Sequence, residues 1–221
     1  MADIIGCFEL RQAPGGMAGT CLQQTVGEHT LSWAPEWHHY SIIGDEAWTD
    51  YEVSADVLLN PQDEAAVMGR ICDVGSGYGV WAKGYYLKIN EHGMCQLYIT
   101  RGKLDQKELI GDAEQQALIL ARKDIEVGGE YVLDSAQVQG ITAGKWHNLK
   151  LRFEGDEITG YVDGKQVVRA TSDRYQHGMA GIMAPLLQRR VSTPYFDNLT
   201  ITPLGRTKAV HNHSRSPKPL Y

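Results

Sequence analysis

The sequence has 221 residues and a formal net charge of −6, with 21 lysines and arginines against 27 aspartates and glutamates. A mildly acidic chain without a basic block ahead of residues 206–221 lacks the electrostatic footprint of a nucleic-acid-binding protein. No apolar run approaches the roughly 20 residues that span a bilayer. The 24 glycines, about 11% of the chain, indicate many turns and therefore short strands.

Alternation of apolar and polar residues predicts strands along most of the chain. Residues 51–59 show it most clearly, with Val53, Ala55 and Val57 on one face. Residues 105–125 carry acids early and favour one helical turn or a long loop. The other strands predicted in the first half cover 6–10, 20–26, 41–43, 67–72, 80–90 and 96–100.

Three strands joined by tight turns are predicted next. Residues 146–153 alternate, Gly155-Asp156 turns the chain into 158–162, and Asp163-Gly164 is a strong hairpin signal before 166–168. This pattern is typical of an antiparallel meander. Two further strands are predicted at 179–183 and 195–202.

The number and spacing of these strands predict an all-β fold, an antiparallel β-sandwich of jelly-roll type. We expect one domain over residues 1–203 and a polar, proline-bearing tail over 204–221. The first residues lack the features of a secretory signal. This indicates either a protein that stays inside the cell or a piece of a longer chain.

The four cysteines, Cys7, Cys21, Cys72 and Cys95, form no C-x-x-C pair, which argues against a zinc knuckle or a thioredoxin-like site. Buried thiols are one interpretation. One disulfide in an oxidising compartment is the other, and the sequence does not choose among the pairings.

The sequence lacks common signatures of hydrolytic enzymes. A glycosidase needs two carboxylates in one cleft, and this chain has neither an E-x-D-x-x-E strand nor a G-x-S-x-G motif. His38 and His39 are adjacent, so in a strand their side chains point to opposite faces and do not share a metal ion. We therefore predict no catalytic residue and no transition-metal site.

Aromatic residues crowd between positions 33 and 48, with polar residues among them. Aromatic rings stack on the apolar face of a sugar while polar groups bind its hydroxyls. The predicted carbohydrate-binding patch consists of Trp33, Trp37, His39, Tyr40 and Asp45. The alternative is that these rings belong to the core, and for Trp48 core packing is favoured.

A structural calcium ion is predicted from carboxylates on terminal strands. Glu9 lies on the first predicted strand and Asp197 on the last. Calcium takes carboxylate and backbone oxygens as ligands. If these strands pair, the two carboxylates lie close enough to share the ion.

Several segments resemble the C-terminal lectin domain of the galactocerebrosidase family. The more specific part is Ile43-Gly44-Asp45 followed by Trp48-Thr49-Asp50. The other similar segments, in the same order, are 21–26, 31–34, 53–57, 68–71, 145–151, 178–182 and 196–198. The last of them are shared more widely with concanavalin A-like lectin/glucanase sandwiches. The resemblance spans roughly residues 6–202 and is weakest over 73–140.

The resemblance implies a lectin domain of a glycoside hydrolase that removes galactose from galactosylceramide and related β-galactosides. In that family the catalytic glutamates lie in a preceding TIM barrel, so none is carried over. It also implies a calcium ion with Asp197 as one ligand. The implied partners are a carbohydrate or glycolipid glycan and a TIM-barrel domain in cis or in trans. A part of such a hydrolase would be extracellular or lysosomal, and a complete chain cytoplasmic.

The sequence therefore predicts a carbohydrate-facing accessory domain of a galactosylceramidase-like hydrolase. One alternative is a scaffold domain that packs against a catalytic partner and binds no sugar. Another is a stand-alone sandwich hydrolase, and the missing carboxylate strand argues against it.

Overall fold

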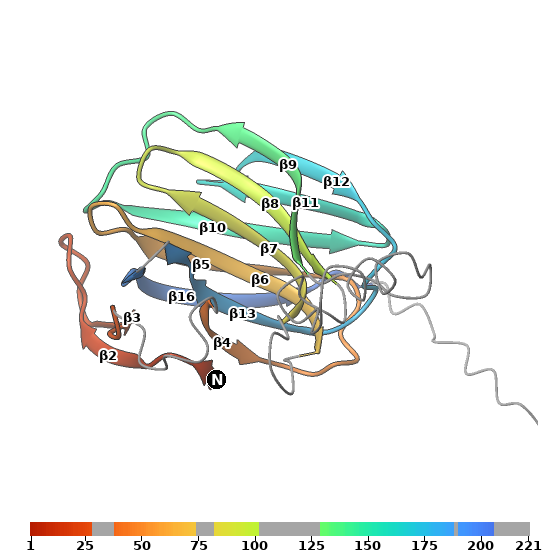
Figure 1. Ribbon diagram of the computed structural model, residues 1–221, viewed down its shortest axis with the longest axis horizontal. Helices are drawn as coiled ribbons and strands as arrows, with labels where there is room; N and C mark the ends of the chain where they lie inside the picture. The colour runs from red at the N-terminus through yellow and green to blue at the C-terminus, as the bar shows by residue number, and fades with distance from the viewer. Residues whose placement is uncertain (28–37, 74–81, 102–128, 188–189, 206–221) are drawn as a thin grey trace, which may run out of the picture.

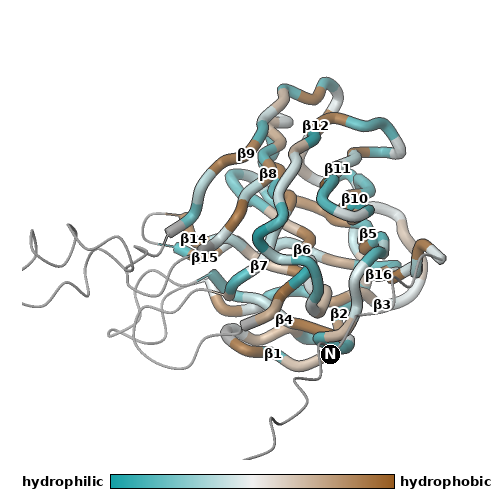
Figure 2. The backbone as a smooth tube through the Cα atoms, turned by 90° about the vertical axis from the view of Figure 1, so that its right-hand side faces the viewer, coloured by the Kyte–Doolittle hydropathy of each residue, from teal (hydrophilic) through white to brown (hydrophobic). Residues whose placement is uncertain are grey.

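The computed structural model describes residues 1–27, 38–73, 82–101, 129–187 and 190–205, which form an antiparallel β-sandwich (Figure 1). Two seven-stranded sheets lie face to face, and a view turned by 90° shows them as two layers (Figure 2). The predicted all-β sandwich is thus confirmed.

Each sheet combines strands from both halves of the chain. Sheet A has the order β1 (Ala2–Ile5), β4 (His39–Ile43), β13 (Met179–Ala184), β6 (Glu64–Asp73), β7 (Lys83–Asn90), β8 (Met94–Arg101), β9 (Gly129–Gln137). Sheet B has the order β12 (Lys165–Thr171), β11 (Glu157–Val162), β10 (Trp146–Glu154), β5 (Tyr51–Leu58), β16 (Tyr195–Pro203), β3 (Thr20–Gln24), β2 (Phe8–Gln12). A short hairpin joins β14 (Leu186–Leu187) to β15 (Arg190–Val191).

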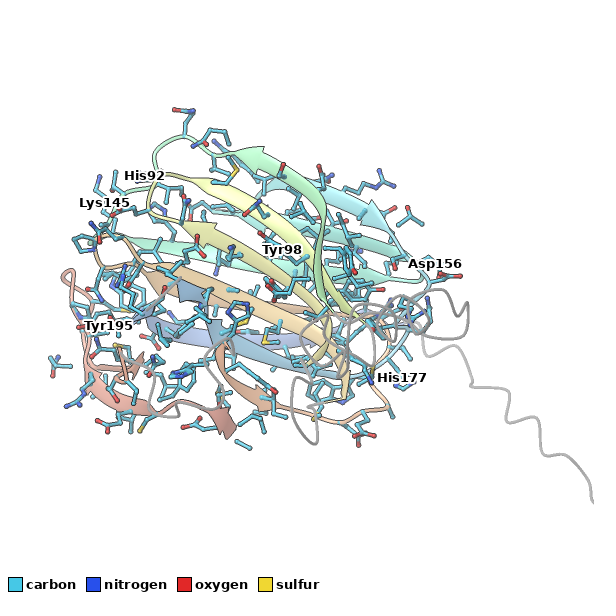
Figure 3. The ribbon with its side chains drawn as sticks, viewed as in Figure 1. His92, Tyr98, Lys145, Asp156, His177 and Tyr195 are labelled. Atoms are coloured by element: carbon cyan, nitrogen blue, oxygen red, sulfur yellow. The ribbon has the colours of Figure 1, made fainter. Side chains whose placement is uncertain are left out.

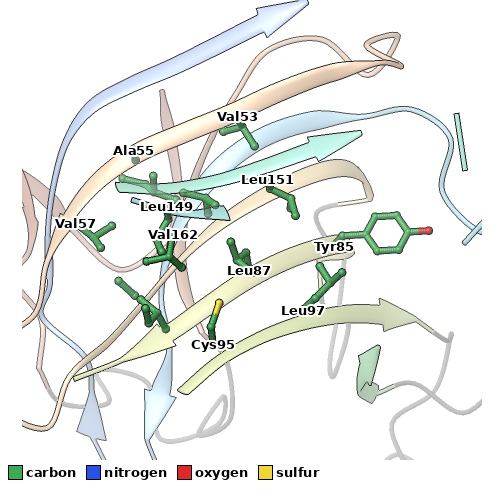
Figure 4. Packing of buried hydrophobic residues seen from close by; sticks show 14 of the residues in the cluster. Val53, Ala55, Val57, Tyr85, Leu87, Cys95, Leu97, Leu149, Leu151 and Val162 are labelled. Carbon is green, nitrogen blue, oxygen red and sulfur yellow. The ribbon is translucent and has the colours of Figure 1, made fainter. Parts of the chain in front are cut away.

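The main core fills the space between the sheets (Figure 4). On β5 and β10, Val53 pairs with Leu151 and Ala55 with Leu149, and all four side chains are buried against sheet A. Leu87 of sheet A is buried in the same cluster. Burying each large aliphatic side chain contributes roughly 1.5–3 kcal/mol. The burial of these alternating apolar side chains therefore stabilises the packing of the two sheets.

The predicted meander is confirmed in β10, β11 and β12. At the second turn Asp163 has φ 49° and Gly164 φ 75°. Two successive positive φ values are the geometry of a tight hairpin turn that matches the twist of the strands. The Asp-Gly pair was therefore a reliable signal.

Four strands were not predicted: β1, β9 and the two strands of the β14–β15 hairpin. β1 and β9 lie at the edges of sheet A, where one-sided burial is weak, and Tyr131 and Val132 of β9 are exposed. The hairpin strands have only two residues each. Most of the predicted tail (206–221), the segment 105–125 and the start of the strand predicted at 80–90 lie outside the described residues.

The chain crosses from one sheet to the other near its N-terminus. β1 pairs with β4 in sheet A, β2 pairs with β3 in sheet B, and only Gly6 and Cys7 lie between β1 and β2. Gly6 has φ +95°, and a Cβ there would lie 2.8 Å from atoms of His39. Glycine is required both by the backbone conformation and by this contact.

A buried arginine holds one end of the sandwich. Arg70, in the bulged part of β6, has no exposed surface, and its ring neighbour is Phe153, 5.0 Å from the guanidinium to the ring centroid. Its guanidinium donates to Asp50 Oδ1 at 3.2 Å and to three backbone carbonyls. Its backbone N–H donates to the Tyr51 hydroxyl at 2.6 Å. This arginine is structural, since protein groups use its donors.

All four cysteines carry free thiols, and Cys21 and Cys95 are buried. This favours the interpretation of the cysteines as buried thiols over that of a disulfide. No helix in the described part of the chain is long and apolar enough to cross a bilayer.

Candidate functional site

A cluster of polar and aromatic residues lies on the face of sheet A turned away from the main core. Strand alternation places it there: on β7, Tyr85 and Leu87 point into the core, so Tyr86 and Lys88 point outward. Tyr98 of β8 lies near the middle of this face (Figure 3). We call the following set the sheet A cluster: His38, Glu64, Tyr86, Lys88, Tyr98 and Glu130.

Two stacked tyrosines form its aromatic part. Tyr86 and Tyr98 are directly paired across β7 and β8. Their rings are 4.7 Å apart at an interplanar angle of 9°, and Lys88 Nζ lies 5.0 Å from the Tyr98 ring centroid. The Tyr98 hydroxyl donates to Gln96 Oε1 at 2.9 Å. Tyr86 is buried, whereas Tyr98 is partly accessible.

A histidine and a glutamate from distant segments meet beside this stack. His38 Nδ1 accepts a hydrogen bond from the Leu186 N–H at 2.7 Å, so its Nε2 carries the proton and donates to Glu130 Oε1 at 2.9 Å. Burial alone would raise the pKa of Glu130, but His38, Tyr86 and Lys88 outweigh it and lower that pKa. Glu130 is thus held as a carboxylate.

The second pair joins Lys88 to Glu64 at 2.9 Å. Desolvation opposes the charge of Lys88, but Glu64 and Tyr98 favour it and raise its pKa. In both pairs a carboxylate faces a nitrogen donor. The cluster therefore offers hydrogen-bonding groups and an aromatic surface, an arrangement that suits a ligand with many hydroxyls.

A separate pocket of about 320 Å³ lies where β5 begins and β16 ends, beside the loop between β4 and β5. Its lining is mostly apolar and includes Trp48, Ile201 and Pro203, with Asp50 as its charged residue. Trp48, for which core packing is the favoured prediction, packs against the main core while partly buried, and it also lines this pocket.

Three of the predicted carbohydrate-binding residues, His39, Tyr40 and Asp45, are described by the structure, and these three do not share one surface. Trp33 and Trp37 lie outside the described residues. His39 is buried on β4 beside Gly6, and Tyr40 is buried in the apolar cluster on the outer face of sheet A. Asp45 is exposed and accepts a hydrogen bond from the Ala47 N–H at 2.8 Å. Of the three that the structure describes, Tyr40 alone lies on the face of the sheet A cluster.

The predicted calcium ligands are not on paired strands. β3 lies between β2, which carries Glu9, and β16, which carries Asp197, so the two backbones are about two strand spacings, roughly 10 Å, apart. Glu9 is paired with Arg11, and Asp197 accepts a hydrogen bond from the Asn198 N–H. The described residues contain no group of three or more His, Cys, Asp or Glu side chains suited to a metal ion, and the strand order does not support an ion shared by Glu9 and Asp197.

Sequence reasoning missed Tyr86, Lys88, Tyr98 and Glu130. The signal for the first three was the alternation of 83–90 and 94–101, which places one tyrosine of each strand on the outer face. The contact of Glu130 with His38 joins residues 92 positions apart, and local pattern does not report such a contact.

Together, the fold and the sheet A cluster define a lectin-like β-sandwich. The chain belongs to the family of the galactocerebrosidase C-terminal lectin domain, whose model matches residues 3–116. A galactocerebrosidase of Danio rerio is 28% identical over 167 residues, which cover 74% of this chain and 21% of that protein. The chain thus spans about a fifth of the length of this relative.

Solved structures agree with the fold. The carbohydrate-binding module CBM66 from Bacillus subtilis is similar with a TM-score of 0.58 and 15% identity, covering 91% of this chain and 94% of that one. A glycoside hydrolase family 16 endo-glucanase from Bacteroides ovatus reaches a TM-score of 0.50 at 13% identity, covering 88% and 84%. At these identities the likenesses concern the fold, and both support the two-sheet sandwich.

Proposed function

We propose that this domain binds a glycan on the outer face of sheet A, through the sheet A cluster. The observation that carries the proposal is the stacked pair of Tyr86 and Tyr98 flanked by His38–Glu130 and Lys88–Glu64. Tyr86 stacks on the Tyr98 ring and Lys88 lies over it, so Tyr98 contributes the part of its ring that stays accessible to the apolar surface of a sugar. Gln96 and the two side-chain pairs supply donors and acceptors for hydroxyls. Membership of a lectin-domain family supports this role.

We further propose that the glycan is a β-galactoside or glycolipid headgroup, and that the domain serves a catalytic TIM barrel in cis or in trans. The galactocerebrosidase relative supports both, since this chain matches only part of it. The domain then contributes recognition, and the hydrolytic carboxylates belong to the barrel.

Binding to an array of glycans, with the folded chain as probe, tests the proposal. Tyr98→Ala removes the accessible ring and is expected to lower the signal at least tenfold. Tyr161→Ala is the matched control, because Tyr161 on sheet B also lies under a lysine, with Lys150 Nζ 4.6 Å from its ring centroid, and its loss should leave binding unchanged. An array without signal from the folded wild-type chain favours the scaffold role instead.

A further inference from the structure

We propose that the pocket beside Trp48 is a second ligand site, which takes one ring of a neutral sugar. It is distinct in sequence and position from the sheet A cluster, since it is lined by the β4–β5 loop, the start of β5 and the end of β16. The choice of a sugar as ligand rests on the proposed glycan binding, whereas the existence of the site rests on the pocket itself.

The aromatic wall of the pocket is fixed before any ligand binds. The Trp48 ring lies so close over Gly44 that a Cβ at Gly44 would be 2.3 Å from it. The backbone N–H of Trp48 donates to the Asp45 carbonyl at 3.2 Å, and the backbone carbonyl of Trp48 accepts from the Gly178 N–H at 2.9 Å. The ring itself contacts Gly44 and packs edge-on against Tyr51, with 5.9 Å between the ring centroids. A ring positioned in this way loses little conformational entropy when a ligand binds against it.

The carboxylate of Asp50 is equally fixed. Oδ1 accepts hydrogen bonds from Arg70 Nη2 at 3.2 Å and from the Gly155 N–H at 3.0 Å. Within the described part of the chain Oδ2 accepts none. The pocket therefore presents one oriented acceptor next to an apolar surface, which is the polar complement of a ligand hydroxyl.

The charge balance and the volume of the pocket narrow the class of ligand that it can bind. Arg70 already balances the charge of Asp50, so the pocket has no unpaired anion to select an amine, and a neutral hydroxyl donor is favoured. A volume of about 320 Å³ is at the lower end of the range for ligand pockets. One pyranose ring, rather than an oligosaccharide, matches both features.

The test is an NMR titration of the full chain with methyl β-galactoside and methyl β-glucoside. The expected result is a saturable shift of the Trp48 indole N–H, assigned with Trp48→Phe, and of the Ala47 and Gly205 amides. Ala47 is exposed at the rim, so Ala47→Phe should block the pocket and weaken binding at least tenfold without disturbing the core. Tyr98→Ala should leave these shifts intact.

Two results overturn the proposal. One is the absence of shifts at Trp48, Ala47 and Gly205 with either glycoside. The other is an equal response to cyclohexanol, which fills the space but lacks the pattern of hydroxyls. If the glycan array still depends on Tyr98, only the second site has failed. If the array is also without signal, the proposed function has failed with it.

Discussion

Arg70 and Asp50 form a buried ion pair, with Nη2 and Oδ1 3.2 Å apart, that joins the bulge of β6 to the start of β5. The Arg70 guanidinium also donates hydrogen bonds to the backbone carbonyls of Thr49, Tyr175 and Gly155. One side chain thereby connects four segments of the chain and supports one wall of the pocket beside Trp48.

Arg70→Met is expected to destabilise the domain by about 3–5 kcal/mol, because it leaves the largely buried Asp50 carboxylate without its counter-charge. Chemical denaturation measures the free energy of unfolding. Arg169→Met is the control: Arg169 pairs with Glu157 at the surface, and such pairs contribute about 0–1 kcal/mol. Equal losses in the two variants would contradict a special role for Arg70.

Gly44→Ala is expected to displace the Trp48 ring, since the new Cβ would lie 2.3 Å from it. Gly140→Ala is the matched control, because Gly140 also has a positive φ, at +88°, but nothing lies within 4 Å of the Cβ position. The strain of the backbone is common to both variants, so the difference between them reports the clash. We expect Gly44→Ala to lose at least about 1 kcal/mol more and to change the near-UV circular dichroism. Identical spectra would refute the contact.

The pH dependence of stability should report the His38–Glu130 pair. Folding lowers the pKa of Glu130, so its contribution is present above the ordinary glutamate pKa of about 4.3 and is lost as the pH falls below that value. Glu130→Gln should therefore be less stable than wild type at neutral pH, and the gap should narrow towards pH 3. Chemical denaturation of both proteins between pH 7 and about pH 3 measures this difference in the free energy of unfolding. A gap that stays constant with pH would assign the loss to packing alone.

Calcium binding by Asp197 predicts a higher melting temperature in excess calcium chloride than in chelator, because an ion that binds only the folded state stabilises it. Asp197→Asn should remove that difference. Glu9→Gln should leave it in place, since Glu9 lies one strand further away and pairs with Arg11. A wild-type melting temperature unchanged by either additive rules the site out.

The interior strands were predictable, and the site was not. Strands such as 51–58 and 146–154 are buried on one face, so apolar and polar residues alternate along their sequences. Edge strands such as Gly129–Gln137 lack it, because both faces are partly open. Tight turns such as Asp163-Gly164 were predictable for a different reason: few residues adopt their backbone angles.

The site depends on neighbours that the order of residues does not reveal. Among the residues crowded between 33 and 48, His39 and Tyr40 are adjacent in a strand and point to opposite sides of sheet A. Glu9 and Asp197 were placed together on the assumption that their strands pair, and the insertion of β3 between them separates the two. Strand order within a sheet is set by packing of the whole domain, not by local pattern.

The two-residue link at Gly6 and Cys7 has a mechanical consequence. Because β1 is bonded to one layer and β2 to the other, a force applied ahead of Ala2 first loads the hydrogen bonds between β1 and β4, and reaches β2 only after these have opened. Under such a force, β1 would therefore separate from β4 before any strand of the second sheet is loaded. Its separation would leave the hydrogen bonds of the second sheet intact.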